Sequence, residues 1–201
     1  MFIAFAIILV LFVIAFVAFL IFLKKMSFET FNKLCERKVR RIAKYNDLLA
    51  IEKLNILNFE REKIGIHHVV FGKKYIYLIT DFLLKGFVTG DAKDNSWVCL
   101  NTSDKKKHYI RNLNKISQQN IQEFAGILGI NTDPMVSICL VPNECDFSIK
   151  HLESKKELIV HYSSLSRKIK KLEEQEIGSL NEQQIYEQFR TIQGKNNESS
   201  R

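Results

Sequence analysis

Between residues 66 and 91 the chain alternates short apolar runs with brief polar interruptions, a pattern typical of closely connected β-strands. Ile66–Phe71 and Tyr75–Thr80 are β-branched or aromatic almost throughout, and Gly72–Lys74 between them is polar and of hairpin length. A third strand is expected to begin near Phe87. Because both faces of the first two strands are apolar, the pattern predicts the centre of a sheet that is covered on both sides.

The remaining apolar positions predict a mixed α/β domain. In the predicted helices they recur every three or four residues, whereas the predicted strands are short continuous apolar runs. Ser27 is suited to cap the first helix, and Gly129 to end the second. We predict helices over Ser27–Tyr45, Asn112–Leu128, Ser163–Glu176 and Glu182–Ile192, strands over Leu48–Leu57, Trp97–Leu100, Met135–Val141 and Leu158–Tyr162, and a polar loop over Thr102–His108. This order favours a mixed sheet with helices on both faces, in which the hairpin and the Met135 strand are central.

The amino-terminal segment has a pattern of its own. Residues 1–23 contain no charged side chain and no Gly, Pro, Asn or Gln. At about 1.5 Å per residue, a helix of this length reaches about 34 Å, enough to cross a hydrocarbon core of about 30 Å. A cleavable signal peptide would instead begin with basic residues and end in small ones. The pattern therefore predicts an uncleaved transmembrane helix over 1–23, followed by a basic juxtamembrane segment over 24–32.

The charges beside this span predict its orientation. In residues 24–44, eight Lys and Arg stand against two Glu, and Lys24 and Lys25 follow the span directly. The positive-inside rule places this side in the cytoplasm. The four cysteines show no CxxC pair, no dense framework and no zinc-module spacing, which agrees with a reducing compartment and a role in the core. The expected location is the cell membrane, crossed once, with the soluble domain in the cytoplasm.

The net charge of +8 belongs entirely to residues 24–201. Anionic lipid headgroups and nucleic acid both attract a basic protein, so composition alone does not distinguish these partners. A protein partner is a further alternative. The candidate residues for binding nucleic acid or lipid are the clustered basic residues Lys24, Lys25, Arg37, Lys38, Arg40, Arg41, Lys105, Lys106 and Lys107.

A series of short motifs carries a family resemblance. In chain order these are Lys33-Leu34-Cys35-Glu36-Arg37-Lys38-Val39, Ile66 to Gly72, Tyr75 to Gly86, Trp97, and Asn114-Lys115-Ile116-Ser117-Gln118-Gln119. In this order the motifs, which reach from about residue 33 to 147, resemble the NERD (nuclease-related) domain, which has a restriction-endonuclease-like fold. The framework residues of the resemblance are Glu36, His68, Gly72, Gly86, Trp97, Asn114 and Gln118. We therefore expect a NERD-like domain over 33–162, with C-terminal helices over 163–193 and a disordered tail over 194–201.

The chain departs from the family at the positions that matter for catalysis. In the family, a strand Asp, a Glu and a Lys form the catalytic set, in which two carboxylates hold Mg²⁺ against the scissile phosphate. Here the corresponding positions carry His67, Thr80 and Phe82, and only Glu36, the helix carboxylate, is retained. A neutral imidazole is a poor ligand for Mg²⁺, and Thr and Phe supply no charge. The resemblance therefore implies a degenerate site without a metal or other cofactor.

Asp81 and Lys85 leave open a relocated site that would bind Mg²⁺. Asp81 is one residue from the lost Glu, so on a regular strand its side chain points to the opposite face. The simpler expectations are a strand-end carboxylate in solvent for Asp81 and an ion pair with the arginine four residues on for Glu36. By the same alternation His67 and His68 point to opposite faces, which favours a structural role for His68 in bonding the backbone.

Three functions remain consistent with these residues. The favoured one is a membrane-anchored, catalytically inactive NERD-like domain that binds nucleic acid or a protein at the cytoplasmic membrane face. The first alternative is an active Mg²⁺-dependent nuclease with a relocated site. The second is a structural, membrane-proximal interaction domain whose basic face serves lipid alone.

Overall fold

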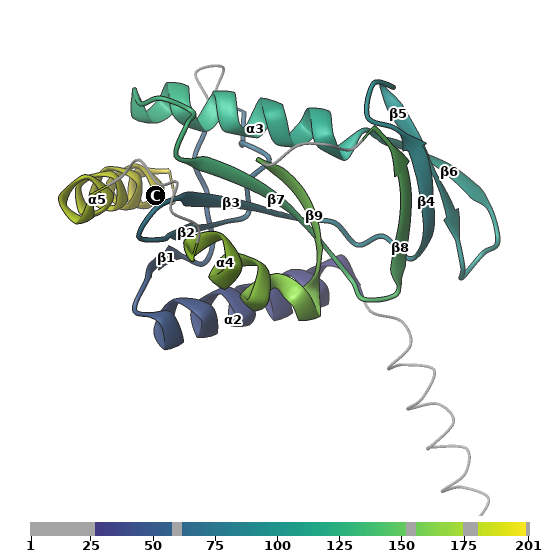
Figure 1. Cartoon of the computed structure of the whole chain (residues 1–201), viewed down its shortest axis with the longest axis horizontal. Helices are drawn as coiled ribbons and strands as arrows, with labels where there is room; N and C mark the ends of the chain where they lie inside the picture. The colour runs from purple at the N-terminus through teal and green to yellow at the C-terminus, as the bar shows by residue number, and fades with distance from the viewer. Residues whose placement is uncertain (1–26, 58–61, 152–155, 175–180, 200–201) are drawn as a thin grey trace, which may run out of the picture.

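The computed structural model describes residues 27–57, 62–151, 156–174 and 181–199, and it shows a mixed α/β fold with two mixed sheets flanked by helices (Figure 1). The predicted transmembrane helix over 1–23 lies outside the described residues, as do Lys24 and Lys25. Within the described ranges, no helix is both long enough and apolar enough to cross a membrane.

The larger sheet contains the predicted hairpin at its centre. Its five strands lie in the order β1-β2-β3-β7-β9, with β2 antiparallel to its neighbours β1 and β3, and with β7 and β9 parallel to β3. Every residue of β2, β3 and β7 is buried, which is the reason for their continuously apolar sequences. The strand bounds are β1 Leu49–Ile51, β2 His68–Phe71, β3 Ile76–Asp81, β7 Met135–Val141 and β9 Glu157–His161.

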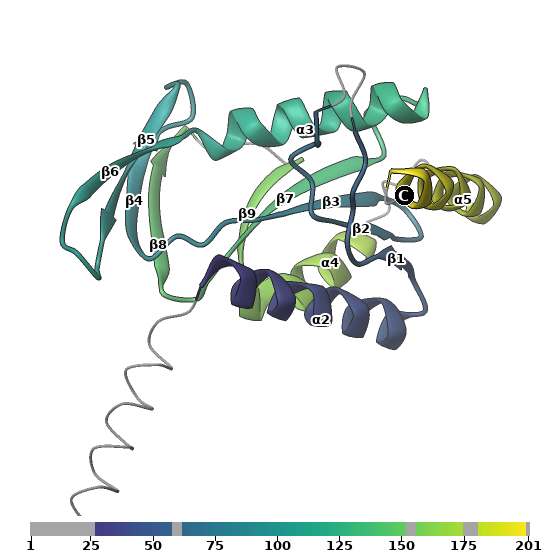
Figure 2. The same ribbon diagram turned by 180° about the vertical axis from the view of Figure 1, so that it is seen from behind.

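Helices cover both faces of this sheet, as predicted (Figures 1 and 2). α2 (Phe28–Asn46) and α4 (Leu165–Glu173) lie on one face, and α3 (Leu113–Leu128) lies on the other. α5 (Glu182–Glu198) packs beside β1 and α3, and the short 3-10 helix η1 (Tyr162–Ser164) precedes α4. The predicted caps are confirmed: the Ser27 hydroxyl accepts from the backbone N–H of α2, and Gly129 ends α3 in the left-handed conformation at φ 67°.

The second sheet has four strands in the order β6-β5-β4-β8 and stands at one end of the first. Its inner face packs through Val88 and Trp97 against Leu113 of α3 and Val141 of β7. The predicted third strand near Phe87 is therefore present, but it belongs to this separate sheet. Its strands are β4 Gly86–Asp91, β5 Ser96–Asn101, β6 Lys107–Arg111 and β8 Cys145–Lys150.

Two of these strands, β6 and β8, are missing from the sequence-based prediction. β6 is an edge strand with mostly exposed side chains, and β8 alternates buried with exposed residues, so neither has an apolar run. β1 also ends at Ile51 instead of residue 57, and α4 ends three residues before the predicted end.

Helix α5 continues to Glu198, through most of the tail that the sequence predicts to be disordered. Tertiary hydrogen bonds hold its last turns. Asn196 Oδ1 accepts from the backbone N–H of Asn55 at 2.6 Å, and Lys195 Nζ donates to the carbonyl oxygen of Ile127 at 2.9 Å. Polar composition alone does not reveal such contacts.

Three buried apolar clusters stabilise the fold, and all their buried members lie between Phe31 and Ile192. One cluster lies between the larger sheet and α3 with α5, the second between that sheet and α2 with α4, and the third behind the second sheet. Removal of this much apolar surface from water is the main favourable contribution to folding.

Deletion of residues 1–23 should therefore leave a soluble domain that unfolds cooperatively. The single tryptophan, Trp97, is fully buried and reports the transition by fluorescence during guanidinium unfolding. Aggregation of the truncated chain, or a transition without cooperativity, would show that the amino-terminal segment is part of the fold.

Candidate functional site

The positions that correspond to the family's catalytic set lie at the end of β3, where α2 crosses it. Thr80 and Asp81 point to opposite faces of the sheet, as predicted. Thr80 Oγ1 accepts from Asn120 of α3 at 2.9 Å, whereas Asp81 Oδ2 accepts from Asn32 of α2 at 2.8 Å. The Thr80 and Asp81 side chains are therefore separated by the sheet itself.

The Asp81 side chain is completely buried, so the prediction of a strand-end carboxylate in solvent is wrong. Its Oδ2 atom accepts from Asn32 and lies 2.8 Å from Nε2 of His68, while Oδ1 has no hydrogen-bond partner among the described residues. The sequence does not show that α2 covers the end of the strand. Because a buried carboxylate is costly unless it is paired, the contact with His68 determines the chemistry of this site.

His68 is held between two hydrogen-bond acceptors. Its Nε2 faces the Asp81 carboxylate, and its Nδ1 bonds the backbone carbonyl of Glu52. A neutral imidazole has one N–H, so with Asp81 ionised both bonds require the doubly protonated ring. Burial by itself would lower the pKa of His68, but the hydrogen bond and charge of Asp81 with the Glu52 carbonyl outweigh it and raise the pKa above 6.5. The predicted role of His68 in bonding the backbone is confirmed, and an ion pair is added to it.

His67 lies one residue before β2, and its ring does not follow the strand alternation. Its Nδ1 accepts from the backbone N–H of Asp81 at 2.8 Å, and its ring centroid lies 6.2 Å from that of His68 and 5.8 Å from that of Phe28. The expectation that the two histidines face opposite sides is therefore wrong. Burial lowers the pKa of His67, in agreement with its role as an acceptor.

Two residues of α2, Cys35 and Glu36, lie near the cluster formed by Asp81, His68 and His67. Cys35 is fully buried, and burial together with the neighbouring Asp81 carboxylate raises the pKa of its thiol, so it is not a thiolate nucleophile. Glu36 is partly exposed and pairs with Arg40 at 3.4 Å, as predicted. Arg40 in turn also bonds Glu52.

The other catalytic positions have structural roles. Thr80 Oγ1 donates to the carbonyl oxygen of Gly65 at 2.9 Å, and the Phe82 ring packs against the third apolar cluster. Lys85 lies on the connection between β3 and β4. In the part of the chain that the structure describes, no three His, Cys, Asp or Glu side chains are arranged to hold one metal ion.

Most framework residues of the resemblance stabilise the fold. Gly72 leaves room for a carboxylate of α4, since an added Cβ would meet it at 2.2 Å. Gly86 begins β4 at φ 121°, which a side chain disfavours. Trp97 is fully buried and donates to a β4 carbonyl at 2.8 Å. Asn114 and Gln118 lie on α3, and Gln118 is exposed.

The predicted basic residues form two separate groups. Arg37, Lys38, Arg40 and Arg41 lie on α2, whereas Lys105, Lys106 and Lys107 lead into β6 of the second sheet.

No pattern in the sequence identifies Asn32 as a residue of the site. Its position four residues before Glu36 and three before Cys35 shows only that the three share one face of a helix.

Comparison with known proteins adds no relative: no family model, curated protein or solved structure matches the chain.

The His68–Asp81 pair predicts a pH dependence of stability. The folded state keeps a proton on His68 that the unfolded chain releases above pH 6.5, so the free energy of unfolding should fall as pH rises through the raised pKa. In Asp81→Asn this fall should disappear, and stability below it should drop by about 3 kcal/mol, the cost of an unpaired buried charge. Trp97 fluorescence during guanidinium unfolding between pH 5 and 9 measures both effects.

Asp133→Asn is the matched control. Asp133 is an exposed carboxylate that pairs with Lys156 at 3.2 Å. Removal of its charge should therefore change the free energy of unfolding by less than about 1 kcal/mol at every pH. An Asp81→Asn variant with the pH dependence of the wild type would show that His68 is not protonated in the folded state.

Proposed function

We propose that the chain is a membrane-anchored, nuclease-related domain without catalytic activity, which acts as a binding module at the cytoplasmic face of the membrane. The proposal combines the apolar span over 1–23, the NERD-like motifs and the geometry of the cluster around Asp81. Nucleic acid, a protein and anionic lipid are its candidate partners.

The arrangement of the larger sheet supports the nuclease-related part of the proposal. The resemblance implies a restriction-endonuclease-like fold, and the order of the predicted elements indicates a mixed sheet with helices on both faces and with the hairpin and the Met135 strand at its centre. In the structure β3 lies between β2 and β7, and α2 and α3 cover opposite faces. The helix carboxylate Glu36 lies on α2, across the sheet from the Thr80 side chain, so these two positions of the resemblance do not converge.

The proposed absence of catalysis rests mainly on the buried pair of His68 and Asp81. A magnesium site needs at least two carboxylates within about 2.1 Å of one ion and room for water and phosphate. Asp81 is the only fully buried carboxylate in the cluster, and its charge is already matched by His68. Thr80 and Phe82 have structural roles, and among the described residues no second carboxylate joins Asp81 to hold an ion.

The basic surface of α2 supports a location against anionic lipid. α2 begins at Phe28, shortly after the predicted span, and α4 lies beside it, with Lys38 Nζ 5.4 Å from the centre of the Tyr162 ring. Among the described residues none of the following has an ion-pair partner: Arg37, Lys38, Arg41, Arg167, Lys168 and Lys171. Basic residues near an anionic membrane contribute about 1 kcal/mol each, so this two-helix surface would hold the domain against the bilayer.

A cleavage assay tests the proposal. We expect the purified chain to cleave neither single- nor double-stranded DNA or RNA with Mg²⁺ or Mn²⁺. Thr80→Glu should not restore cleavage, because the new carboxylate would lie on the α3 face while His67 and Phe82 remain. Gel analysis of end-labelled substrates measures the result.

Glu36→Gln and Asp81→Asn are the informative comparisons in that assay. Any metal-dependent cleavage by the wild type that either variant abolishes would establish a relocated site and contradict the proposal. Cleavage that survives in both variants would indicate a contaminating nuclease.

A further inference from the structure

The outer face of the second sheet, the face turned away from the core, presents three large apolar side chains to solvent. Phe87 of β4 is 44% exposed, Leu100 of β5 is 45% exposed and Tyr109 of β6 is 80% exposed. They lie on three neighbouring strands, β4, β5 and β6, and the strand register brings them together in one patch. Scattered exposed apolar residues are ordinary, but a contiguous patch on one sheet face indicates a binding surface.

The strand register shows how the patch is arranged. Leu100 pairs directly with Phe87 on one side and with Lys107 on the other, and Tyr109 pairs with Val98 in the next row. Neighbouring strands lie about 4.8 Å apart and residues two apart on a strand about 6.8 Å, so the Cα atoms of Phe87 and Tyr109 are roughly 12 Å apart. The register places both side chains on the same face of the sheet.

The inner face explains why the outer one is uncovered. Val88, Trp97, Cys99 and Cys145 point inward and are buried against α3 and β7. Within the described residues, the helices pack on the larger sheet and behind the second, and the outer face carries none of them (Figure 2). The patch is thus available to a partner.

Charged residues of both signs surround the patch: the carboxylates Glu144 and Asp146 line one end of it, and the cations lie on or beside β6 and at the end of β8. Lys105, Lys107, Arg111 and Lys150 surround it, and none of them forms an ion pair within the described part of the chain. Two of the nearby carboxylates are already bonded to histidines: Asp104 to His108 and Asp91 to His151, each at 2.8 Å. A polyanion therefore finds unpaired cations here.

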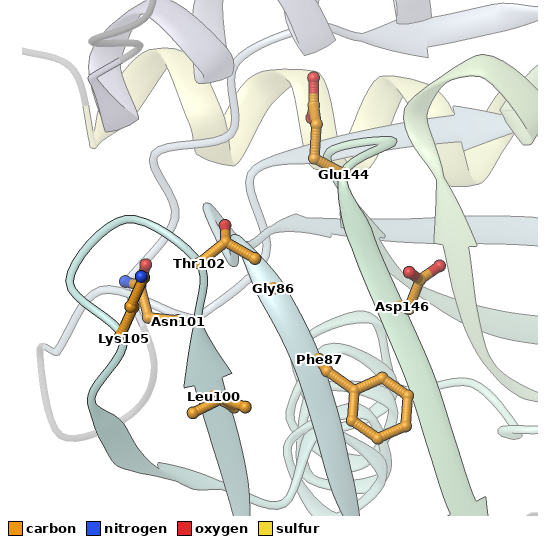
Figure 3. A pocket seen from close by; sticks show the side chains of 8 residues that line it. All are labelled: Gly86, Phe87, Leu100, Asn101, Thr102, Lys105, Glu144 and Asp146. Atoms are coloured by element: carbon orange, nitrogen blue, oxygen red, sulfur yellow. The ribbon is translucent and has the colours of Figure 1, made fainter.

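A hollow of about 530 Å³ opens at one end of the patch (Figure 3). Phe87 and Leu100 form its apolar floor, Lys105 stands on one side, and Asp146 lies beside Phe87 on the other. Gly86 at the edge of the hollow allows β4 to approach β5 closely, since an added Cβ would lie 2.0 Å from the Leu100 carbonyl oxygen. Pockets of this size accept small ligands, and a nucleobase is such a group.

We propose that the outer face of the second sheet binds single-stranded nucleic acid. Bases stack on Phe87 and Tyr109, one base enters the hollow, and Lys105, Lys107 and Arg111 contact phosphates. Exposed aromatic rings beside unpaired cations on one face of a sheet fit unpaired bases, whose faces a duplex hides. The inference names a ligand for the binding module proposed above and rests on that proposal only for the absence of cleavage.

Fluorescence anisotropy of a labelled, mixed-sequence 12-nucleotide strand, with the full chain in a neutral detergent, tests the inference. Tyr109→Ala should weaken binding at least fivefold, as expected for loss of one stacked base, and Phe87→Ala with Tyr109→Ala should weaken it roughly thirtyfold. Neither variant changes the charge. Tyr109→Phe keeps the ring and should bind within about twofold of the wild type.

Tyr45→Ala is the matched control, since Tyr45 on α2 is also 80% exposed, and it should bind as the wild type does. Lys107→Gln with Arg111→Gln should weaken binding and reduce its salt dependence. Retention of Trp97 fluorescence shows that each variant is folded.

Three results would overturn the inference: no binding, equal affinity for the strand and its duplex, or an unchanged affinity in Tyr109→Ala. Equal affinity for the duplex, or an unchanged affinity in Tyr109→Ala, would indicate a general attraction of polyanions to the basic surface of α2. The patch would then be a candidate site for a protein partner. Cleavage of the strand in the same samples would instead contradict the proposed inactivity and leave the binding surface intact.

Discussion

The buried ion pair between His68 and Asp81 is the interaction on which the arrangement of the larger sheet depends. It joins the end of β3 to β2, and through Asn32 and the Glu52 carbonyl it also fixes α2 and the segment after β1. A charge in this position is tolerated only with its partner in place, because both side chains are almost completely removed from water. The pair therefore specifies which residue of β3 meets which face of α2.

The same pair bears on the chemistry of the proposed inactive domain. In a metal nuclease the carboxylates at the end of such strands need a cation, and Mg²⁺ supplies it. Here an imidazolium beside Asp81 provides the positive charge from within the protein, and it does so without an open coordination position. A stabilising histidine in this place and a metal ion in this place are alternatives, since both neutralise the same carboxylate.

The sequence predicts the elements with apolar runs or helical periodicity and misses those without them. The hairpin, β7 and the four helices follow from residues that are buried on one or both faces. β6 carries Lys107, Tyr109 and Arg111 outward, so its edge position is fixed by pairing with β5, which no local pattern reveals. The strands of the two sheets follow one another in one continuous stretch of strand-forming sequence. The sequence therefore does not show where one sheet ends and the other begins.

Within the candidate site, strand alternation correctly places Thr80 and Asp81 on opposite faces, but exposure and partners depend on tertiary packing. Asp81 is buried because α2 covers the strand end, and His67 does not follow the alternation because it precedes β2.

The division of the molecule into two sheets has a functional consequence that follows from the same packing. Among the described residues, helices cover both faces of the larger sheet, whereas the outer face of the second sheet carries no helix. The exposed aromatic residues of the proposed binding surface therefore lie on the second sheet, away from the cluster around Asp81.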